Sequence, residues 1–537
     1  MKAYDFVIVG AGSAGCVLAN RLSTNPEHRV LLLEAGRDER RKETWIPAAW
    51  SKLFKSSCDW AYQADCGPGL NGRSLFVPRG KALGGTSTIN AMMYLRGNRA
   101  DYDEWAAMGN DGWSYDDVLP YFKRSEDNER GASEYHGAGG PLTVADVRDP
   151  NPLAAAFVEA ATETGIPRIE DPNGATQEGA AFTQVNIRNG KRCSSADAFL
   201  RPVLGRSNLD VVTNAHVLQI IFQGHRATGV KFHRAGGEEI ARADREVVVC
   251  AGALDSPKLL LLSGIGHAEE IRRHGLSLVQ DLPGVGQNLQ EHTGGKILVR
   301  CREPISLLAA ESVGNLIRYI LLRRGMLASS GPEGVAFVKT TPELNAPDVE
   351  IVLLPILWLN EGFTRPSEHG YTIAVVLLKP RSRGFVALQS GDPDRPPRIS
   401  MNLFSDRDGH DMRTTVAGIQ IARRIIEAPA LAALSSGEIF PGTAATSDAD
   451  LAASVRAEAQ TIWHPVGTCR MGTDPMSVVD PGLRVHGIEG LRVIDASVMP
   501  TITRGHTHAP TVMIAEKGAD MLLGLPGDAA TRHPFAD

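Results

Sequence analysis

The chain has 537 residues, which exceeds the size of one ordinary hydrophobic core, so we expect two domains. Its net charge of −6 is mild and it has no long basic run, so nothing indicates a nucleic-acid partner. The seven cysteines are scattered without a C-x-x-C pair, which argues against both a metal site and a disulfide framework.

The first fifteen residues have the pattern of a strand, a glycine-rich turn and a helix. Residues 4–9 are apolar and β-branched, and Gly10, Gly12 and Gly15 follow with G-x-G-x-x-G spacing. In this context Gly10 allows a tight turn, Gly12 lets a pyrophosphate approach the backbone, and Gly15 lets the helix pack closely on the strand. The pattern therefore predicts a dinucleotide site at a helix N-terminus.

A second buried strand is predicted at residues 29–33, and it ends at Glu34. An acid about twenty residues after the glycine turn binds ribose hydroxyls in dinucleotide-binding folds. Because the first strand starts almost at residue 1, we expect no signal peptide and a cytoplasmic location.

Residues 80–90 are too rich in small side chains to fill a core. They predict a backbone that lies against a flat or charged ligand, with a plain glycine loop as the alternative. The tryptophans in front of this run, Trp45, Trp50 and Trp60, are interpreted as packing residues rather than substrate contacts.

A strand, a turn and a helix are predicted a second time, with the turn and the helix at residues 252–266. We expect Ser256 to cap this helix, with Pro257 in its first turn. From about residue 295 to residue 460, the sequence pattern changes to alternating strands and helices without glycine-rich turns. This change predicts a second domain that faces the substrate. Residues 351–359 are the longest apolar run, too short to span a membrane, and are predicted to be a buried strand.

Three histidines lie in glycine-flanked loops near the end of the chain: His464, His506 and His508. Histidine is the side chain best suited to move protons near neutral pH, so these residues are candidates for acid–base catalysis. A structural role is the alternative for each one. Metal binding is not expected, because no carboxylate or cysteine completes a ligand pattern beside them.

Taken together, these stretches resemble the glucose-methanol-choline (GMC) flavin oxidoreductases along essentially the whole chain. The resemblance rests on residues 10–34, 80–90 and 252–266 and on the two loops that carry the histidines. Within the family, the sequence is similar in pattern to bacterial choline dehydrogenase-like and sorbose dehydrogenase-like members. It implies an α/β fold, α+β overall, with a Rossmann-like FAD-binding domain and a discontinuous substrate-binding domain of sheet and helices. We expect the FAD-binding domain at 1–155, 190–295 and 460–537, and the substrate-binding domain at 156–189 and 296–459.

The resemblance also implies FAD rather than NAD, and it assigns residues to the cofactor by position. They are Gly10, Gly12, Ser13, Ala14, Gly15, Glu34, Ala35, Leu83, Gly85, Asn90, Ala91, Met92, Val217, Asp495, Ala496 and Thr507. Some relatives attach FAD covalently through a histidine that precedes the Asn90 position. Ile89 stands there in this chain, so we expect non-covalent FAD.

By the same resemblance, His464 matches the family's general base and His508 matches its partner, while the role of His506 is unassigned. An alcohol loses hydride readily only as its alkoxide forms, so a positioned base must take the proton. We expect oxidation of a primary, sugar or polyol alcohol, with hydride passing to flavin N5. A dehydrogenase that uses a quinone or an electron carrier is preferred, and an oxidase that uses O2 is the alternative.

Three other functions stay open at this point. A hydroxynitrile-lyase-type member would hold flavin without redox turnover, an NAD-dependent dehydrogenase would use only the first fingerprint, and a flavin-binding module would not catalyse. The substrate is equally open. Trp358, Glu361 and Phe363 are candidates for a pocket that binds a cation such as choline, whereas Trp463 beside His464 suits an aromatic alcohol.

Overall fold

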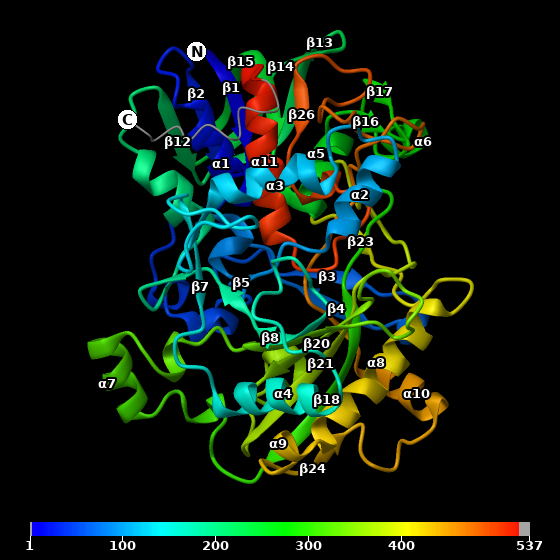
Figure 1. Cartoon of the computed structure of the whole chain (residues 1–537). Coiled ribbons are helices and arrows are strands. Elements are labelled where there is room, and N and C mark those ends of the chain that lie inside the picture. The colour runs from blue at the N-terminus through cyan, green and yellow to red at the C-terminus, as the bar shows by residue number, and fades with distance from the viewer. Residues whose placement is uncertain (1–2, 526–537) are drawn as a thin grey trace.

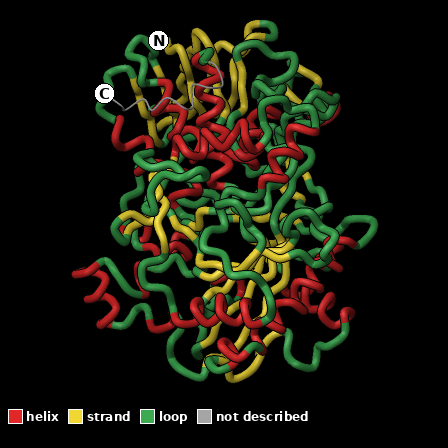
Figure 2. Tube along the Cα trace, viewed as in Figure 1, coloured by secondary structure: helices red, strands yellow, loops and turns green. Residues whose placement is uncertain are grey.

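A computed structural model describes residues 3–525 of the chain. Its strands gather into one large sheet in the upper half of Figure 1 and another in the lower half, and helices cover both (Figure 2). The helices are α1 (Ser13–Leu22), α2 (Arg99–Ala107), α3 (Tyr115–Ser125), α4 (Pro152–Glu163), α5 (Gly252–Leu262), α6 (Ala268–Arg273), α7 (Val313–Leu322), α8 (His410–Glu427), α9 (Pro429–Ala432), α10 (Asp448–Glu458) and α11 (His508–Leu523).

The first sheet contains both strands predicted before residue 35. Its order is β12 (Leu209–Thr213), β2 (Val30–Glu34), β1 (Ala3–Val9), β15 (Gly237–Val249), β14 (Arg226–Arg234) and β13 (His216–Gln223), and β26 (Leu491–Val493) pairs with β15. Strands β12, β2, β1, β15 and β26 are parallel, whereas β13, β14 and β15 form an antiparallel meander.

Parallel pairing brings the carboxyl ends of β1, β2, β15 and β26 to one edge of this sheet. At these ends lie Gly10, which follows β1, Glu34, the last residue of β2, Cys250, which follows β15, and the segment after β26 that leads to Asp495. In open parallel sheets, ligands bind in the crevice outside the carboxyl ends of the strands. Segments that are hundreds of residues apart in sequence therefore meet where a nucleotide would lie.

Two close contacts hold helices to this sheet. A Cβ added to Gly15 in α1 would lie 1.9 Å from the Gly10 oxygen, so only glycine permits the observed approach of helix to strand. Glu516 of α11 is buried and accepts hydrogen bonds from Arg21 of α1 and Arg124 of α3. This ion-pair network joins α1, α3 and α11, and these helices lie side by side in Figure 1.

The second sheet has the order β24 (Ser435–Phe440), β18 (Thr293–Cys301), β21 (Gly370–Leu377), β20 (Val349–Leu354), β19 (Gly334–Val338) and β8 (Gly179–Phe182), with β25 (Gln460–Thr461) paired to β18. Helices α4, α8 and α10 pack against it. Its central strands are buried on both faces. The predicted strand at residues 351–359 is therefore correct only as far as Leu354, where β20 ends, and residues 355–359 lie in the loop that follows.

Smaller sheets lie between the two large ones. One is β22 (Phe385–Ala387), β23 (Arg398–Ser400), β3 (Tyr62–Asp65) and β4 (Ser74–Val77), and the other is β5 (Met93–Tyr94), β9 (Gln184–Val185), β7 (Leu142–Asp146) and β6 (Glu126–Asn128). The first of them joins residues 62–77 to residues 385–400, which the sequence analysis assigned to different domains. The remaining short pairs are β10 (Ile187–Arg188) with β11 (Lys191–Arg192) and β16 (Ile265–Gly266) with β17 (Gln280–Asp281).

One local expectation is wrong. Helix α5 starts at Gly252, so Ser256 and Pro257 lie inside the helix and Ser256 is not its cap. The Ser256 hydroxyl instead donates to the Asp495 carboxylate at 2.5 Å and accepts from the Ala251 N–H. In residues 3–525, no helix is long and apolar enough to cross a membrane, and no cluster of three His, Cys, Asp or Glu side chains could hold a metal ion.

Candidate active site

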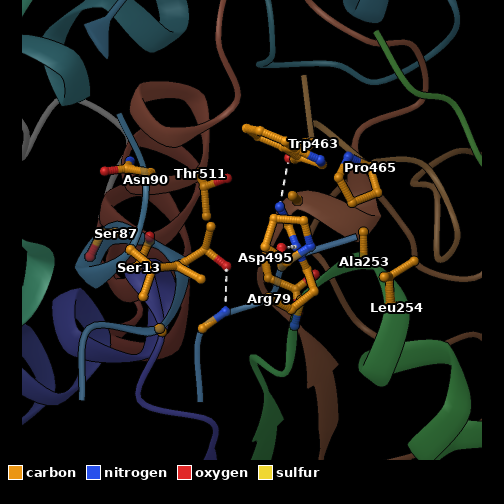
Figure 3. Close-up of a pocket in the computed structure, with 18 of the residues that line it drawn as sticks. Ser13, Arg79, Ser87, Asn90, Ala253, Leu254, Trp463, Pro465, Asp495 and Thr511 are labelled. Carbon is orange, nitrogen blue, oxygen red and sulfur yellow. Dashed lines mark hydrogen bonds between the residues drawn. The ribbon is translucent and has the colours of Figure 1, made fainter. Parts of the chain in front are cut away.

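A long cavity runs from the carboxyl edge of the first sheet to the face of the second sheet. Figure 3 shows Ser13, Ser87, Asn90 and Thr511 on one side of it and Trp463 and Pro465 on the other. The residues assigned to the cofactor that line it are Gly10, Gly12, Ser13, Ala14, Glu34, Ala35, Gly85, Asn90, Ala91, Met92, Val217, Asp495, Ala496 and Thr507. Gly15 and Leu83 do not line it, because Gly15 packs against the Gly10 turn and Leu83 is in the hydrophobic core.

The end of the cavity at Glu34 has the features of a nucleotide site. The Glu34 carboxylate accepts from the N–H groups of Ala11 (2.9 Å) and Gly36 (2.8 Å), and burial raises its pKa to about 7. Gly10 has φ +98°, a value that glycine adopts without strain. The Gly12 backbone approaches Gly85 so closely that a Cβ on Gly85 would lie 2.7 Å from the Gly12 Cα. The two glycine-rich runs therefore form one cradle.

The middle of the cavity fits the flavin part of FAD. His508 is the first residue of α11, and its buried Nδ1 has no hydrogen-bond partner in residues 3–525. Asp495 accepts from the Gly252 N–H at 2.8 Å and fixes the N-terminus of α5 beside the cavity. A Cβ added to Gly252 would meet only open space. Helix N-termini with unpaired donors favour a group that carries negative charge. The N-termini of α5 and α11 beside the cavity therefore suit FAD.

His464 occupies the other end of the cavity, on a loop whose backbone is held in an unusual conformation. Trp463 has φ +63°, which is strained for a bulky residue. The Arg79 guanidinium donates to the Trp463 carbonyl at 2.6 Å, and the buried Glu291 carboxylate accepts from the His464 N–H at 2.5 Å. These contacts hold the backbone of the loop in this conformation.

A second histidine sets the tautomer of His464. His292 Nε2 lies 3.1 Å from the Leu378 carbonyl, which can only accept, so His292 Nε2 carries the proton. His292 Nδ1 then accepts from His464 Nδ1, 2.9 Å away. With Nδ1 of His464 protonated, its Nε2 has a free lone pair.

Burial and nearby groups keep the His464 and His292 rings neutral. Burial, followed by the neighbouring His506, His292 and Arg79, holds the pKa of His464 well below its usual value. Burial also lowers the pKa of His292 to about 3. A neutral imidazole with a free Nε2 is the form that a general base requires.

The structure brings His506, and not His508, into contact with His464. The ring centroids of His506 and His464 are 4.6 Å apart, and His506 Nε2 lies 3.3 Å from the buried Glu350 carboxylate. His508 Nε2 instead lies 3.0 Å from the Ser195 hydroxyl. The geometry therefore favours His506 over His508, the residue expected from the sequence, as the partner of His464.

The wall around the histidines is apolar and aromatic. Its members are Trp50, Phe54, Met92, Met93, Pro332, Val352, Leu354, Ala374, Val376, Ile462, Trp463 and Pro465. Trp50 and Trp60 pack against Trp358 and Tyr62, as expected, and they also line the cavity. Trp45 packs against Tyr319.

The three residues considered for a cationic pocket do not line this cavity. Glu361 accepts from the Phe76 N–H at 3.0 Å, and the Lys55 ammonium lies 3.9 Å from the Phe363 ring centroid. Trp358 stacks on Trp50 from outside the cavity lining. None of these three side chains therefore faces a ligand bound in this cavity.

Sequence reasoning did not identify His292, Glu291 or Glu350 as site residues. Each is a single polar residue on or beside a strand of the second sheet, without a motif around it. Their roles follow from which strands lie next to the histidine loops, and that is a property of the fold.

Comparisons with known proteins identify the family of this chain. Two models of the GMC oxidoreductase family match residues 4–294 and 380–515. The chain is 44% identical to an alcohol dehydrogenase [acceptor] of Pseudomonas putida over 530 residues, covering 97% of this chain and 96% of the relative. It is 40% identical to the mitochondrial choline dehydrogenase of Homo sapiens over 543 residues, covering 97% and 90%.

A solved structure with the same fold is pyridoxine 4-oxidase from "Mesorbium loti". Its TM-score is 0.89 at 34% identity, covering 96% of this chain and 98% of that one. The family matches, the relatives and the cavity all point to the same conclusion. The chain belongs to the GMC oxidoreductase family and is an FAD-dependent oxidoreductase acting on CH–OH donors.

Proposed function

We propose that the protein is a dehydrogenase of neutral, apolar primary alcohols. The observation that carries this proposal is the apolar wall around a neutral His464. Within the described residues, the carboxylates that line the cavity are Glu34, Asp255 and Asp495, and all three come from the nucleotide half. The two carboxylates beside the histidines, Glu291 and Glu350, contact the His464 N–H and the His506 ring and do not line the cavity, whereas Arg79 does. A cationic alcohol therefore has no counter-charge in the cavity wall around the histidines.

The proton of the substrate hydroxyl passes to His464 Nε2 in this proposal. His292 and the Leu378 carbonyl hold that nitrogen in its unprotonated form. His506, oriented by Glu350, hydrogen-bonds the same substrate oxygen as negative charge develops on it. Bound FAD supplies the acceptor for the hydride of the alcohol carbon.

The proposed FAD is non-covalent. Ile89 lines the cavity at the position where some relatives attach the cofactor, and its alkyl side chain offers no nucleophile. His508 and Thr507 at the start of α11, with Asn90 opposite, would hold the flavin through hydrogen bonds. An acceptor other than O2 is favoured by the relative named as an alcohol dehydrogenase [acceptor].

The proposal is tested by the visible spectrum of the purified protein under anaerobic conditions. We expect a yellow protein that bleaches with 1-octanol or benzyl alcohol, bleaches poorly with choline, and recovers its colour faster with a quinone than with air. Bleaching by choline in preference to both neutral alcohols would refute the substrate class. A yellow protein that no alcohol bleaches would favour the lyase alternative.

A further inference from the structure

Helix α7 (Val313–Leu322) is the most exposed apolar element of the described chain. Six of the thirteen large apolar side chains that are exposed in residues 3–525 belong to it: Val313, Leu316, Ile317, Ile320, Leu321 and Leu322. Val313 and Leu321 are 74% and 73% exposed. The helix projects from the side of the molecule, away from both sheets (Figures 1 and 2).

Four of the six apolar side chains share one face of this helix, and Leu322 lies off it. Val313, Leu316, Ile317 and Ile320 have the i, i+3, i+4, i+7 spacing of a single stripe. Tyr319 lies on the opposite face, where it is buried and donates to the Gly190 carbonyl at 2.9 Å. The helix is therefore anchored to the protein by its other face while its apolar stripe remains uncovered.

A basic hollow lies beside this stripe. It is lined by Arg188, Lys191, Arg192 and Arg323, with Asp197 as the only acid of its lining in the described chain. Arg323 caps α7, and its guanidinium lies 5.1 Å from the Tyr319 ring centroid, so helix and hollow are neighbours. Most large exposed apolar patches on soluble proteins mark an interaction site, and basic residues beside one attract anionic lipid.

We propose that α7 and this hollow dock the protein peripherally on an anionic lipid bilayer. The apolar stripe would enter the boundary between headgroups and acyl chains, and the hollow would receive a lipid phosphate. The charge of the hollow favours this occupant over a second copy of the chain, because an interface of two such faces would bring like charges together.

The docking would orient the active site. Trp45 stacks on Tyr319 of α7 with ring centroids 6.3 Å apart. Two residues after Trp45 begins the short helix Pro47–Leu53, which carries Trp50 into the cavity wall. A bilayer held by α7 would thus lie next to the segment that forms part of the alcohol-binding wall.

The test is flotation of the FAD-loaded protein with lipid vesicles. We expect binding to phosphatidylcholine vesicles that contain about 30% phosphatidylglycerol, weaker binding to pure phosphatidylcholine, and loss of binding as NaCl rises to about 0.5 M. The double variant Ile317→Ser, Leu321→Ser should lower vesicle partitioning at least about tenfold, and Lys191→Glu about fivefold or more. All three side chains are outside the cavity, so turnover of a soluble alcohol should be unchanged.

Matched control variants change the same kinds of side chain elsewhere on the surface. They show whether binding depends on α7 and the hollow or only on the number of apolar and charged groups. Ile240→Ser removes an exposed apolar side chain from β15, and Arg272→Glu reverses an exposed charge on α6. Both controls should partition like the wild type. Wild-type protein that stays in solution with anionic vesicles would overturn the proposal. So would a wild-type dimer in lipid-free buffer that the double variant converts to a monomer, because α7 would then be a contact between copies.

Discussion

The different roles proposed for His506 and His508 give a sharp test of the active-site geometry. His506 lies against His464 and would hydrogen-bond the substrate oxygen, whereas His508 lies at the start of α11 with an unpaired Nδ1. A hydrogen bond to a charged group contributes about 1.5–3 kcal/mol, and 1.4 kcal/mol corresponds to a tenfold change in rate. His506→Ala should therefore slow flavin reduction roughly 10- to 100-fold.

The assay is anaerobic stopped-flow reduction at saturating alcohol, together with the flavin content of each purified variant. His506→Asn keeps a hydrogen-bond donor and should recover much of the lost rate. His508→Ala should lower the amount of FAD retained but change the rate of the loaded fraction less than about tenfold. A normal rate in His506→Ala together with a large loss in loaded His508→Ala would refute the assignment and make His508 the partner.

Two further predictions concern protonation. A base must be neutral, and the pKa of His464 is far below its usual 6.5, so the reduction rate should stay constant from about pH 8 to pH 6; an inflection near 6.5 in the stopped-flow pH profile would contradict this. Burial raises the pKa of Glu516, but Arg21 and Arg124 outweigh it and the net shift is downward. Glu516→Gln should destabilise the protein by about 3–5 kcal/mol at pH 7, measured by urea unfolding. The stabilisation by a carboxylate with a lowered pKa is lost as pH falls, so wild type and variant should converge below about pH 4; a constant difference would argue against the ion pair.

The sequence predicted the nucleotide half of the molecule well because that half is built from local patterns. The glycine spacing at Gly10, Gly12 and Gly15 requires only a strand before it and a helix after it, and both are present. Glu34 could be placed by its distance along the chain from the glycine turn. Parallel strands then bring such segments to one edge without further information.

The catalytic half depended on packing that no local pattern reports. His292, Glu291 and Glu350 reach the site because β18 and β20 pass beside the histidine loops. His506 and His508 are two residues apart, and only the start of α11 at His508 determines which of them faces His464. The tautomer of His464 likewise depends on the Leu378 carbonyl, which any residue at that position would supply.

The central claim is that His464 takes the proton of the alcohol. Its most direct test is anaerobic stopped-flow reduction of wild type and His464→Ala with the alcohol that bleaches the wild type best. We expect the variant to retain FAD and to reduce it more than about 10²-fold more slowly, since the loss of an acid–base group typically costs at least that factor. Reduction of the variant at the wild-type rate would contradict the account.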